Sequence, residues 1–177
     1  MTEFVVADAA IRQLHARYTD AVWRKDVVAF GDCFTDDAQW RLSGLVLRGR
    51  TDIAEFMTGI FLKYRYILLN LRTPILEVGD GTATGRTYVS EQNVLADGRP
   101  FGPMGVYYEH FVDQGERWRF SWRLFHTSYL GPPDLSGTFF AIPDFGPPPA
   151  MPPLDAPTFD HGGTSAHARD IAKTKPE

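Results

Sequence analysis

Residues 83–130 read ATGRTYVSEQNVLADGRPFGPMGVYYEHFVDQGERWRFSWRLFHTSYL, and this stretch decides the fold. Runs rich in aromatic and β-branched residues alternate in it with the pairs Asp97-Gly98 and Gln114-Gly115, which favour tight turns. A similar run precedes it and ends at a Gly-Asp-Gly turn. The predicted strands cover residues 66–78, 83–95, 102–112 and 118–130. Long consecutive strands joined by tight turns predict an antiparallel meander.

The residues before this meander have mainly helical periodicity. Apolar side chains recur at helical spacing over residues 7–25, and shorter patterns predict helices over residues 27–33 and 51–63. A small hairpin, residues 38–42 and 45–47, is expected between the second and third helices. Helices that precede a curved sheet indicate an α+β domain, with the helices covering one face of the sheet.

Proline divides the chain into a domain and a tail. Ten of the 13 prolines lie at or after Pro132, so the folded domain is expected over residues 1–131. Residues 132–160 form a Pro/Phe-rich tail that is apolar enough to pack on the domain or on a neighbouring subunit. Residues 161–177 are polar and are expected to be disordered.

Composition excludes several classes of protein. The 177 residues carry a net charge of −4 without a Lys/Arg cluster, which argues against nucleic-acid and membrane partners. The N-terminus lacks the features of a secretory signal, so the cytoplasm is the expected location. The single cysteine and the scattered histidines favour no metal site. The aromatic share of 14% indicates either an aromatic core or a cavity lined by rings.

Five short motifs in the right order resemble the SnoaL-like group of the NTF2-like superfamily. They are IRQLHARY at 11–18, FTDDAQW at 34–40, RGRTDI at 48–53, ATGR at 83–86 and WRFS at 118–121. The resemblance covers residues 9–129 and implies a cone in which N-terminal helices pack on a curved antiparallel sheet and enclose an apolar pocket. Relatives such as scytalone dehydratase, bile acid dehydratase and hexachlorocyclohexane dehydrochlorinase perform cofactor-free eliminations. Others are non-catalytic binding modules or small subunits of ring-hydroxylating dioxygenases, so the fold alone does not fix the chemistry.

The resemblance also implies a catalytic pair that this chain lacks. Those dehydratases commonly pair an acidic residue on the first helix with a histidine on the first long strand. The corresponding positions here are Trp23 and Leu69, or Tyr66 if the alignment slips by a few residues. The chain has therefore lost this activity or uses other groups.

Other groups are available at positions where relatives carry pocket residues. Tyr18 matches a pocket Tyr or Lys, Glu91 an active-site acid and Arg123 a pocket arginine, so these three are the candidate catalytic residues. Tyr18 could equally be a core tyrosine, and Glu91 could form an ion pair with Arg123. The candidate substrate-binding residues are Trp23, Trp40, Tyr66, Leu69, Thr87, Val89, Tyr107, Phe125 and Thr127.

Strand alternation assigns further side chains to the two faces of the sheet. If Glu91 and Arg123 face the cavity, so do Thr87, Val89, Phe125 and Thr127. A second set would point away and suggests an aromatic subunit interface; it comprises Trp118, Phe120, Trp122, Leu124 and His126. A bulge in either strand would reverse this assignment locally.

The expected function is a cofactor-independent lyase or isomerase acting on a bulky aromatic or polycyclic small molecule, for example a lignin-derived diaryl compound. The reaction would eliminate water or formaldehyde, with the substrate's own ring as electron sink. The alternative is a non-catalytic small-molecule-binding protein or a small subunit of a ring-hydroxylating dioxygenase. A homotrimer is the first expectation for the assembly and a dimer the second. His15 is expected to be partly exposed and His110 to lie on an outer or edge face.

Overall fold

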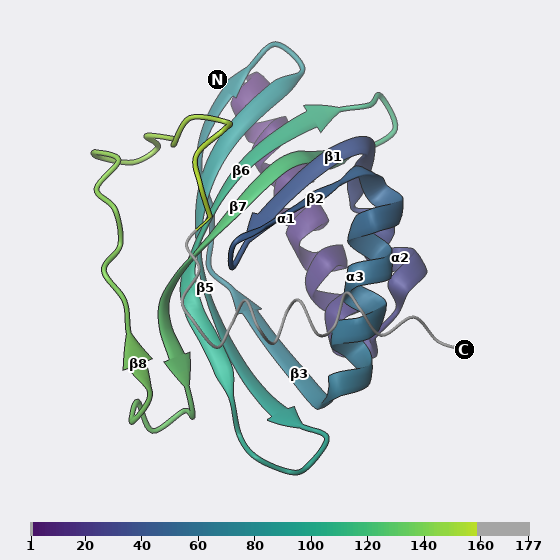
Figure 1. The fold of residues 1–177 in the computed structure, drawn as a ribbon. Helices are drawn as coiled ribbons and strands as arrows, with labels where there is room; N and C mark the ends of the chain where they lie inside the picture. The colour runs from purple at the N-terminus through teal and green to yellow at the C-terminus, as the bar shows by residue number, and fades with distance from the viewer. Residues whose placement is uncertain (1, 159–177) are drawn as a thin grey trace.

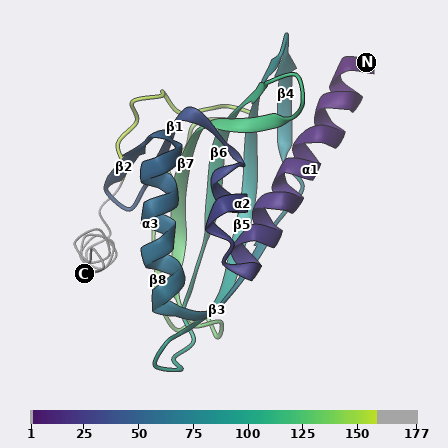
Figure 2. The ribbon, with the colours of Figure 1, turned by 90° about the vertical axis from the view of Figure 1, so that its right-hand side faces the viewer.

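A computed structural model describes residues 2–158 of the chain (Figure 1). Three helices lie on one side of a curved sheet, so the α+β class and the cone-like arrangement are confirmed. They are α1 (Thr2–Arg24), α2 (Val27–Gly31) and α3 (Gly49–Lys63). Figure 2 looks onto the helices and shows α2 between α1 and α3. The predicted second helix is shorter than expected, because the chain enters the first strand at residue 34.

The sheet has eight strands. They are β1 (Phe34–Leu42), β2 (Leu45–Arg48), β3 (Tyr64–Leu71), β4 (Ile75–Gly79), β5 (Thr82–Leu95), β6 (Gly102–Asp113), β7 (Trp118–Gly131) and β8 (Thr138–Phe139). The order is β2-β1-β7-β6-β5-β3, with β4 also paired to β5 and β8 to β7. The predicted hairpin forms as β1 and β2. The β1–β7 pair is parallel, and all other pairs are antiparallel.

One predicted strand, residues 66–78, is two strands in the structure. Both β3 and β4 pair with β5, and residues 72–74 between them belong to neither strand. Pro74 lacks a backbone N–H and disfavours continuous pairing at this point. As a result of the break, β3 pairs with the later part of β5, residues 89–95, and β4 pairs with its earlier part, residues 82–86.

A bulge in β7 changes which side chains face the helices. Phe111 pairs with Phe120, whereas the adjacent His110 pairs with Trp122, so Ser121 is an extra residue without a cross-strand partner. Phe120 and Arg123 therefore face the same side, and the Arg123 guanidinium lies 4.2 Å from the Phe120 ring centroid. The prediction that Phe120 points away from the helices is wrong, because the bulge reverses the alternation.

The predicted aromatic subunit interface is also wrong, because part of the set lies in the core under the helices and the tail of the same chain covers the part that faces outwards. Trp118 and Phe120 belong to the main core under the helices. Trp122 and Leu124 do lie on the opposite face of the sheet, but there they pack against Ala156 of the same chain. Trp118, Phe120 and Trp122 are 7%, 0% and 6% exposed, so none of them offers a free surface for another subunit.

The tail covers this outer face (Figure 1). The indole of Trp122 donates to the carbonyl of Leu154 at 3.1 Å, and Arg41 donates to the carbonyl of Ala156 at 2.9 Å. Phe145 packs edge-on against Tyr108. Residues 132–158 thus lie against the chain's own sheet. The predicted disordered segment, residues 161–177, lies outside the described residues.

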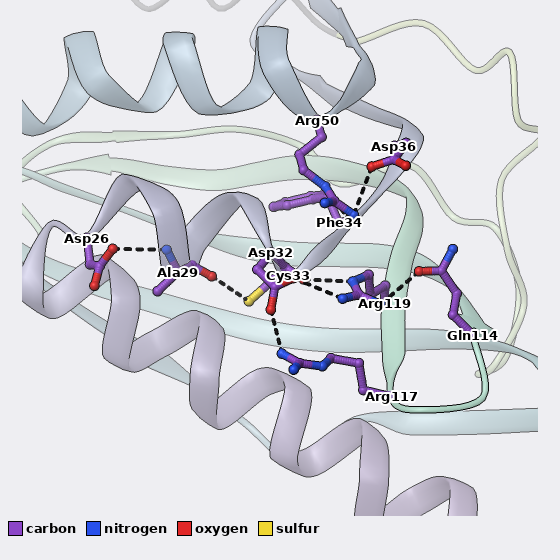
Figure 3. A network of polar contacts seen from close by, with 10 residues as sticks. All are labelled: Asp26, Ala29, Asp32, Cys33, Phe34, Asp36, Arg50, Gln114, Arg117 and Arg119. Carbon is purple, nitrogen blue, oxygen red and sulfur yellow. Dashed lines mark hydrogen bonds and ion pairs between the residues drawn. The ribbon is translucent and has the colours of Figure 1, made fainter.

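A network of charged side chains next to α2 connects the start of β1 with β7 and α3 (Figure 3). The Asp32 carboxylate accepts hydrogen bonds from Arg117, which directly precedes β7, and from Arg119, which lies at the start of β7. Arg50 of α3 donates twice to the carbonyl of Phe34, at 3.0 and 2.7 Å. Charge-assisted bonds of this kind are directional, and here they fix the start of β1 against β7 and α3.

Candidate functional site

A cavity of about 130 Å³ lies between the helices and the concave face of the sheet. Most of its walls are apolar or aromatic. Among residues 2–158, the lining includes no lysine, arginine or histidine, and its only acidic side chain is that of Glu91. The lining side chains from the helices are Tyr18, Val22, Phe56, Met57 and Ile60, and those from the strands and loops include Trp40, Tyr64, Ile67, Leu69, Glu91, Asn93, Phe101, Tyr107, Phe125 and Thr127.

Glu91 lies on β5 and is half-buried at the cavity wall. Asn93, two residues further on the same face of the strand, donates from Nδ2 to Glu91 Oε2 at 2.7 Å. Burial raises the pKa of Glu91 to about 7, although the bond from Asn93 acts in the opposite direction. Glu91 therefore changes its protonation state near neutral pH.

Tyr18 of α1 and Tyr107 of β6 form a second polar group in the cavity. Burial raises the pKa of Tyr18, whereas the charge of Arg123 and a hydrogen bond with Tyr107 lower it. That bond further raises the pKa of Tyr107, which burial already holds well above its usual range. The two hydroxyls and the buried charge of Arg123 are therefore electrostatically coupled.

Arg123 lies behind these tyrosines and does not line the cavity. Its side chain is fully buried, and its guanidinium lies 4.4 Å from the Tyr18 ring centroid and 3.8 Å from that of Tyr107. Its ion-pair partner is Glu109, at 2.8 Å from Nη2 to Oε1, and not Glu91. The Arg123 guanidinium thus packs against the two rings on the side away from the cavity, and Glu109 neutralises its charge.

Glu109 connects Arg123 to two further side chains. It accepts a hydrogen bond from the Thr87 hydroxyl at 2.6 Å and lies 3.1 Å from Nε2 of His15. Burial by itself would raise the pKa of Glu109, but attraction to His15 and Arg123, with their hydrogen bonds, lowers it to about 2. Because the ionised carboxylate only accepts hydrogen bonds, Nε2 of His15 carries a proton.

Neither Glu109 nor the burial of His15 was predicted from the sequence. His15 is 6% exposed, so the expectation of partial exposure is wrong. A signal was available for both residues. Glu109 is two residues after Tyr107 on the same strand face, and His15 is three residues before Tyr18 on the same helix face. His110 contacts Trp122 edge-on, on the outer side of the sheet.

The other candidate residues divide into three groups. Trp40, Leu69, Tyr107, Phe125 and Thr127 line the cavity with Tyr18 and Glu91. Thr87 and Val89 also face the helices, but they are buried beneath the cavity wall at 0% and 5% exposure.

Trp23 and Tyr66 lie outside the cavity, at 50% and 53% exposure. Five helical residues correspond to a rotation of about 140° beyond one full turn, which directs Trp23 away from the face that carries Tyr18. Its indole donates instead to the carbonyl of Leu69 at 2.8 Å. Tyr66 lies next to an irregularity in the β3–β5 pairing, and the buried side chains of β3 are those of Tyr64, Ile67 and Leu69.

Residues 2–158 contain neither a metal-binding cluster nor a membrane-spanning helix. No three His, Cys, Asp or Glu side chains of these residues come together as a metal-binding group. Within the same range, no helix is long and apolar enough to cross a membrane.

Three solved structures illustrate the similarity of the fold. A Novosphingobium aromaticivorans protein proposed to be an aromatic ring hydroxylase is 28% identical, with a TM-score of 0.67 over 73% of this chain and 96% of that chain. A proposed scytalone dehydratase from the same organism is 17% identical, with a TM-score of 0.71 over 88% and 99%. The hexachlorocyclohexane dehydrochlorinase LinA-type3 of Novosphingobium barchaimii is 19% identical, with a TM-score of 0.67 over 80% and 99%.

The sequence matches no curated protein. The family model for the SnoaL-like domain matches residues 4–123, which include both α1 and most of the strands that form the cavity. These residues are more than half of the chain, and the chain therefore belongs to the SnoaL-like domain family within the NTF2-like superfamily.

Proposed function

We propose that the protein is a lyase or isomerase that acts on an aromatic small molecule without a metal or organic cofactor. The observation that carries the proposal is Glu91, the single acidic side chain in the described lining, with a pKa of about 7. A general base is most effective when its pKa lies near the working pH. The hydroxyls of Tyr18 and Tyr107 supply the complementary proton donors in the same cavity.

In the proposed reaction, Glu91 takes a proton from a substrate carbon, and the aromatic ring accepts the electron pair. The neighbouring carbon–oxygen bond then breaks, and the leaving hydroxide takes the Tyr18 proton and departs as water. Return of the proton from Glu91 to Tyr18 restores both groups, so the net change is the loss of one water molecule. With a hydroxymethyl substrate, Glu91 would instead take the hydroxyl proton, and formaldehyde would leave as the carbon–carbon bond breaks. The substrate carbon, which keeps the electron pair of that bond, would then take the proton back from Glu91, so the net change is the loss of formaldehyde.

Arg123 contributes to this proposal without touching the substrate. Its guanidinium lies under the rings of Tyr18 and Tyr107, and its charge lowers the pKa of Tyr18. A nearby fixed cation favours the phenolate that forms when Tyr18 gives up its proton. Arg123 is therefore a positioning residue, a different role from that of a catalytic residue in the pocket, which the resemblance implied.

The comparisons support an elimination as the reaction type. The names of two similar structures, a proposed scytalone dehydratase and a hexachlorocyclohexane dehydrochlorinase, both describe the removal of a small molecule from a ring compound. Of the bulky diaryl and polycyclic substrates that the sequence favours, the proposal takes a diaryl compound, such as a lignin-derived one, because its separate rings can enter the cavity one at a time. The cavity of about 130 Å³ would enclose one ring of such a molecule.

The proposal is tested by incubation with a panel of aryl and diaryl alcohols, followed by mass spectrometry for loss of water or formaldehyde. Glu91→Gln keeps the shape of the side chain and should abolish turnover. Glu77→Gln, at an exposed position of β4, is the matched control and should keep full activity. Full activity in Glu91→Gln would refute the assignment of the base.

A second candidate is a non-catalytic role, either in ligand binding or as the small subunit of a ring-hydroxylating dioxygenase. It is favoured by the side chains of Trp23 and Leu69, which stand where related dehydratases carry their acid and histidine. Co-purification of an unrelated large subunit would support it. Sedimentation equilibrium would test the predicted homotrimer, and a stable homo-oligomer without other chains would argue against a dioxygenase subunit.

A further inference from the structure

The charges around the cavity restrict what it can bind. Glu91 is the only described lining residue that carries a full charge near neutral pH, because the others that ionise are tyrosines whose pKa values are raised. Arg123, the nearest arginine behind the wall, is fully buried and paired with Glu109. An anionic ligand would therefore meet a like charge and, among the described lining residues, no cation that could pair with it.

The cost of burying such an anion is large. A carboxylate transferred from water into an apolar site without an ionic partner loses several kcal/mol of solvation free energy. Repulsion from ionised Glu91 would add to that cost above pH 7. An uncharged ligand avoids both penalties.

The size of the cavity and its hydroxyl groups define the ligand further. An engineered cavity of roughly 150 Å³ in another protein binds benzene, so a cavity of about 130 Å³ accommodates about one aromatic ring. Tyr18, Tyr107 and Thr127 belong to the lining, and their hydroxyls can donate hydrogen bonds, with one of the two tyrosine protons used in the bond between Tyr18 and Tyr107. A ring that carries an acceptor oxygen would pair with such a donor, whereas a pure hydrocarbon would leave it unpaired.

We propose that the cavity selects an uncharged molecule that inserts a single aromatic ring bearing an acceptor oxygen, and that it rejects aryl carboxylates and fused two-ring compounds. The inference rests on the proposed function only in treating this cavity as the substrate site. Binding is measured here without turnover, so the two proposals can fail separately. Selective binding with no product in the turnover assay would refute the lyase and leave the selectivity standing.

The experiment compares three probes by isothermal titration calorimetry at pH 8, where Glu91 is mostly ionised. Acetophenone is the neutral one-ring probe, benzoate has nearly the same shape with a negative charge, and acetylnaphthalene adds a fused ring. Acetophenone should bind at least about 100-fold more tightly than benzoate, because the anion loses its solvation. Equal or tighter binding of benzoate, or no binding of acetophenone, would overturn the charge selectivity.

Two further measurements locate the binding and test the size limit. The indole N–H resonance of Trp40, assigned by its loss in Trp40→Phe, should shift with acetophenone because Trp40 lines the cavity. Acetylnaphthalene should bind at least about tenfold more weakly than acetophenone, and equal affinity would overturn the one-ring limit. In Glu91→Gln the ratio of the acetophenone affinity to the benzoate affinity should decrease. An unchanged ratio would show that the charge of Glu91 does not contribute to the rejection of benzoate.

Discussion

Asn93 is held in one orientation and donates to Glu91. Its Oδ1 accepts a hydrogen bond from the backbone N–H of Leu68 on the neighbouring strand at 3.1 Å, so its Nδ2 must be the atom that lies 2.7 Å from Glu91 Oε2. Because β3 pairs with β5, Asn93 is held in place and fixes one carboxylate oxygen of Glu91, the candidate base. The other oxygen, Oε1, has no hydrogen bond to Asn93.

The first prediction concerns the protonation of Glu91. Removal of the donor in Asn93→Leu should raise the pKa of Glu91 above about 7, because the hydrogen bond favours the ionised form. A carboxyl titration by ¹³C NMR would measure it, and the alkaline shift should also appear in the pH–rate profile. Gln92→Leu, at the adjacent exposed position, should leave the titration unchanged.

The second prediction links Glu91 to stability. Its pKa of about 7 in the folded chain exceeds the ordinary value of 4.5, so folding is favoured by the protonated form. That contribution is complete below pH 4.5 and is lost as the pH rises through 7, with an upper limit of roughly 3 kcal/mol. Glu91→Gln should therefore gain stability over the wild type at pH 8 but not at pH 4.5.

Urea denaturation at both pH values measures this difference. A Glu91→Gln variant less stable than the wild type at pH 8 would contradict the burial of this carboxyl. Glu77→Gln, on the exposed edge of β4, should show no such dependence on pH.

The third prediction concerns the buried charges under the cavity. Glu109→Gln leaves Arg123 without its ionic partner, and loss of one member of a buried pair typically costs about 3–5 kcal/mol. Because the pKa of Glu109 is lowered to about 2, its stabilisation is present above pH 4.5 and is lost as the pH falls towards 2.

Chemical denaturation at neutral pH would measure the loss in Glu109→Gln. The exposed Glu116→Gln is the control and should stay within about 0.5 kcal/mol of the wild type. An equally small change in Glu109→Gln would show that Arg123 does not depend on this partner.

The fourth prediction concerns the close approach of β6 to Glu91. A Cβ atom at Gly102 would lie 2.0 Å from the backbone oxygen of Glu91, so Gly102→Ala must displace one of the two strands. A loss of about 2 kcal/mol or more in unfolding free energy is expected, with weaker binding in the cavity. In Gly79→Ala the nearest atom would be 3.4 Å away, and thermal denaturation should find this control close to the wild type.

Much of the fold follows from local patterns in the sequence. Helical and alternating periodicities identify α1, α3 and the long strands, since each depends on residues close together in the chain. The glycine-containing turns give the order of the meander. The resemblance to SnoaL-like relatives adds Tyr18 and Glu91 as expected cavity residues, and both side chains line the cavity.

The tertiary structure decided how those elements meet. Glu109 is the cross-strand partner of Arg123, and this pairing draws Arg123 away from the cavity and from Glu91. The extra residue Ser121 turns Phe120 towards the helices, a change that alternation along one strand does not reveal. The sequence by itself determined the family, the elements and the presence of an aromatic-lined cavity. Which charged groups face that cavity depends on register and long-range ion pairs, which form only when distant segments pack together.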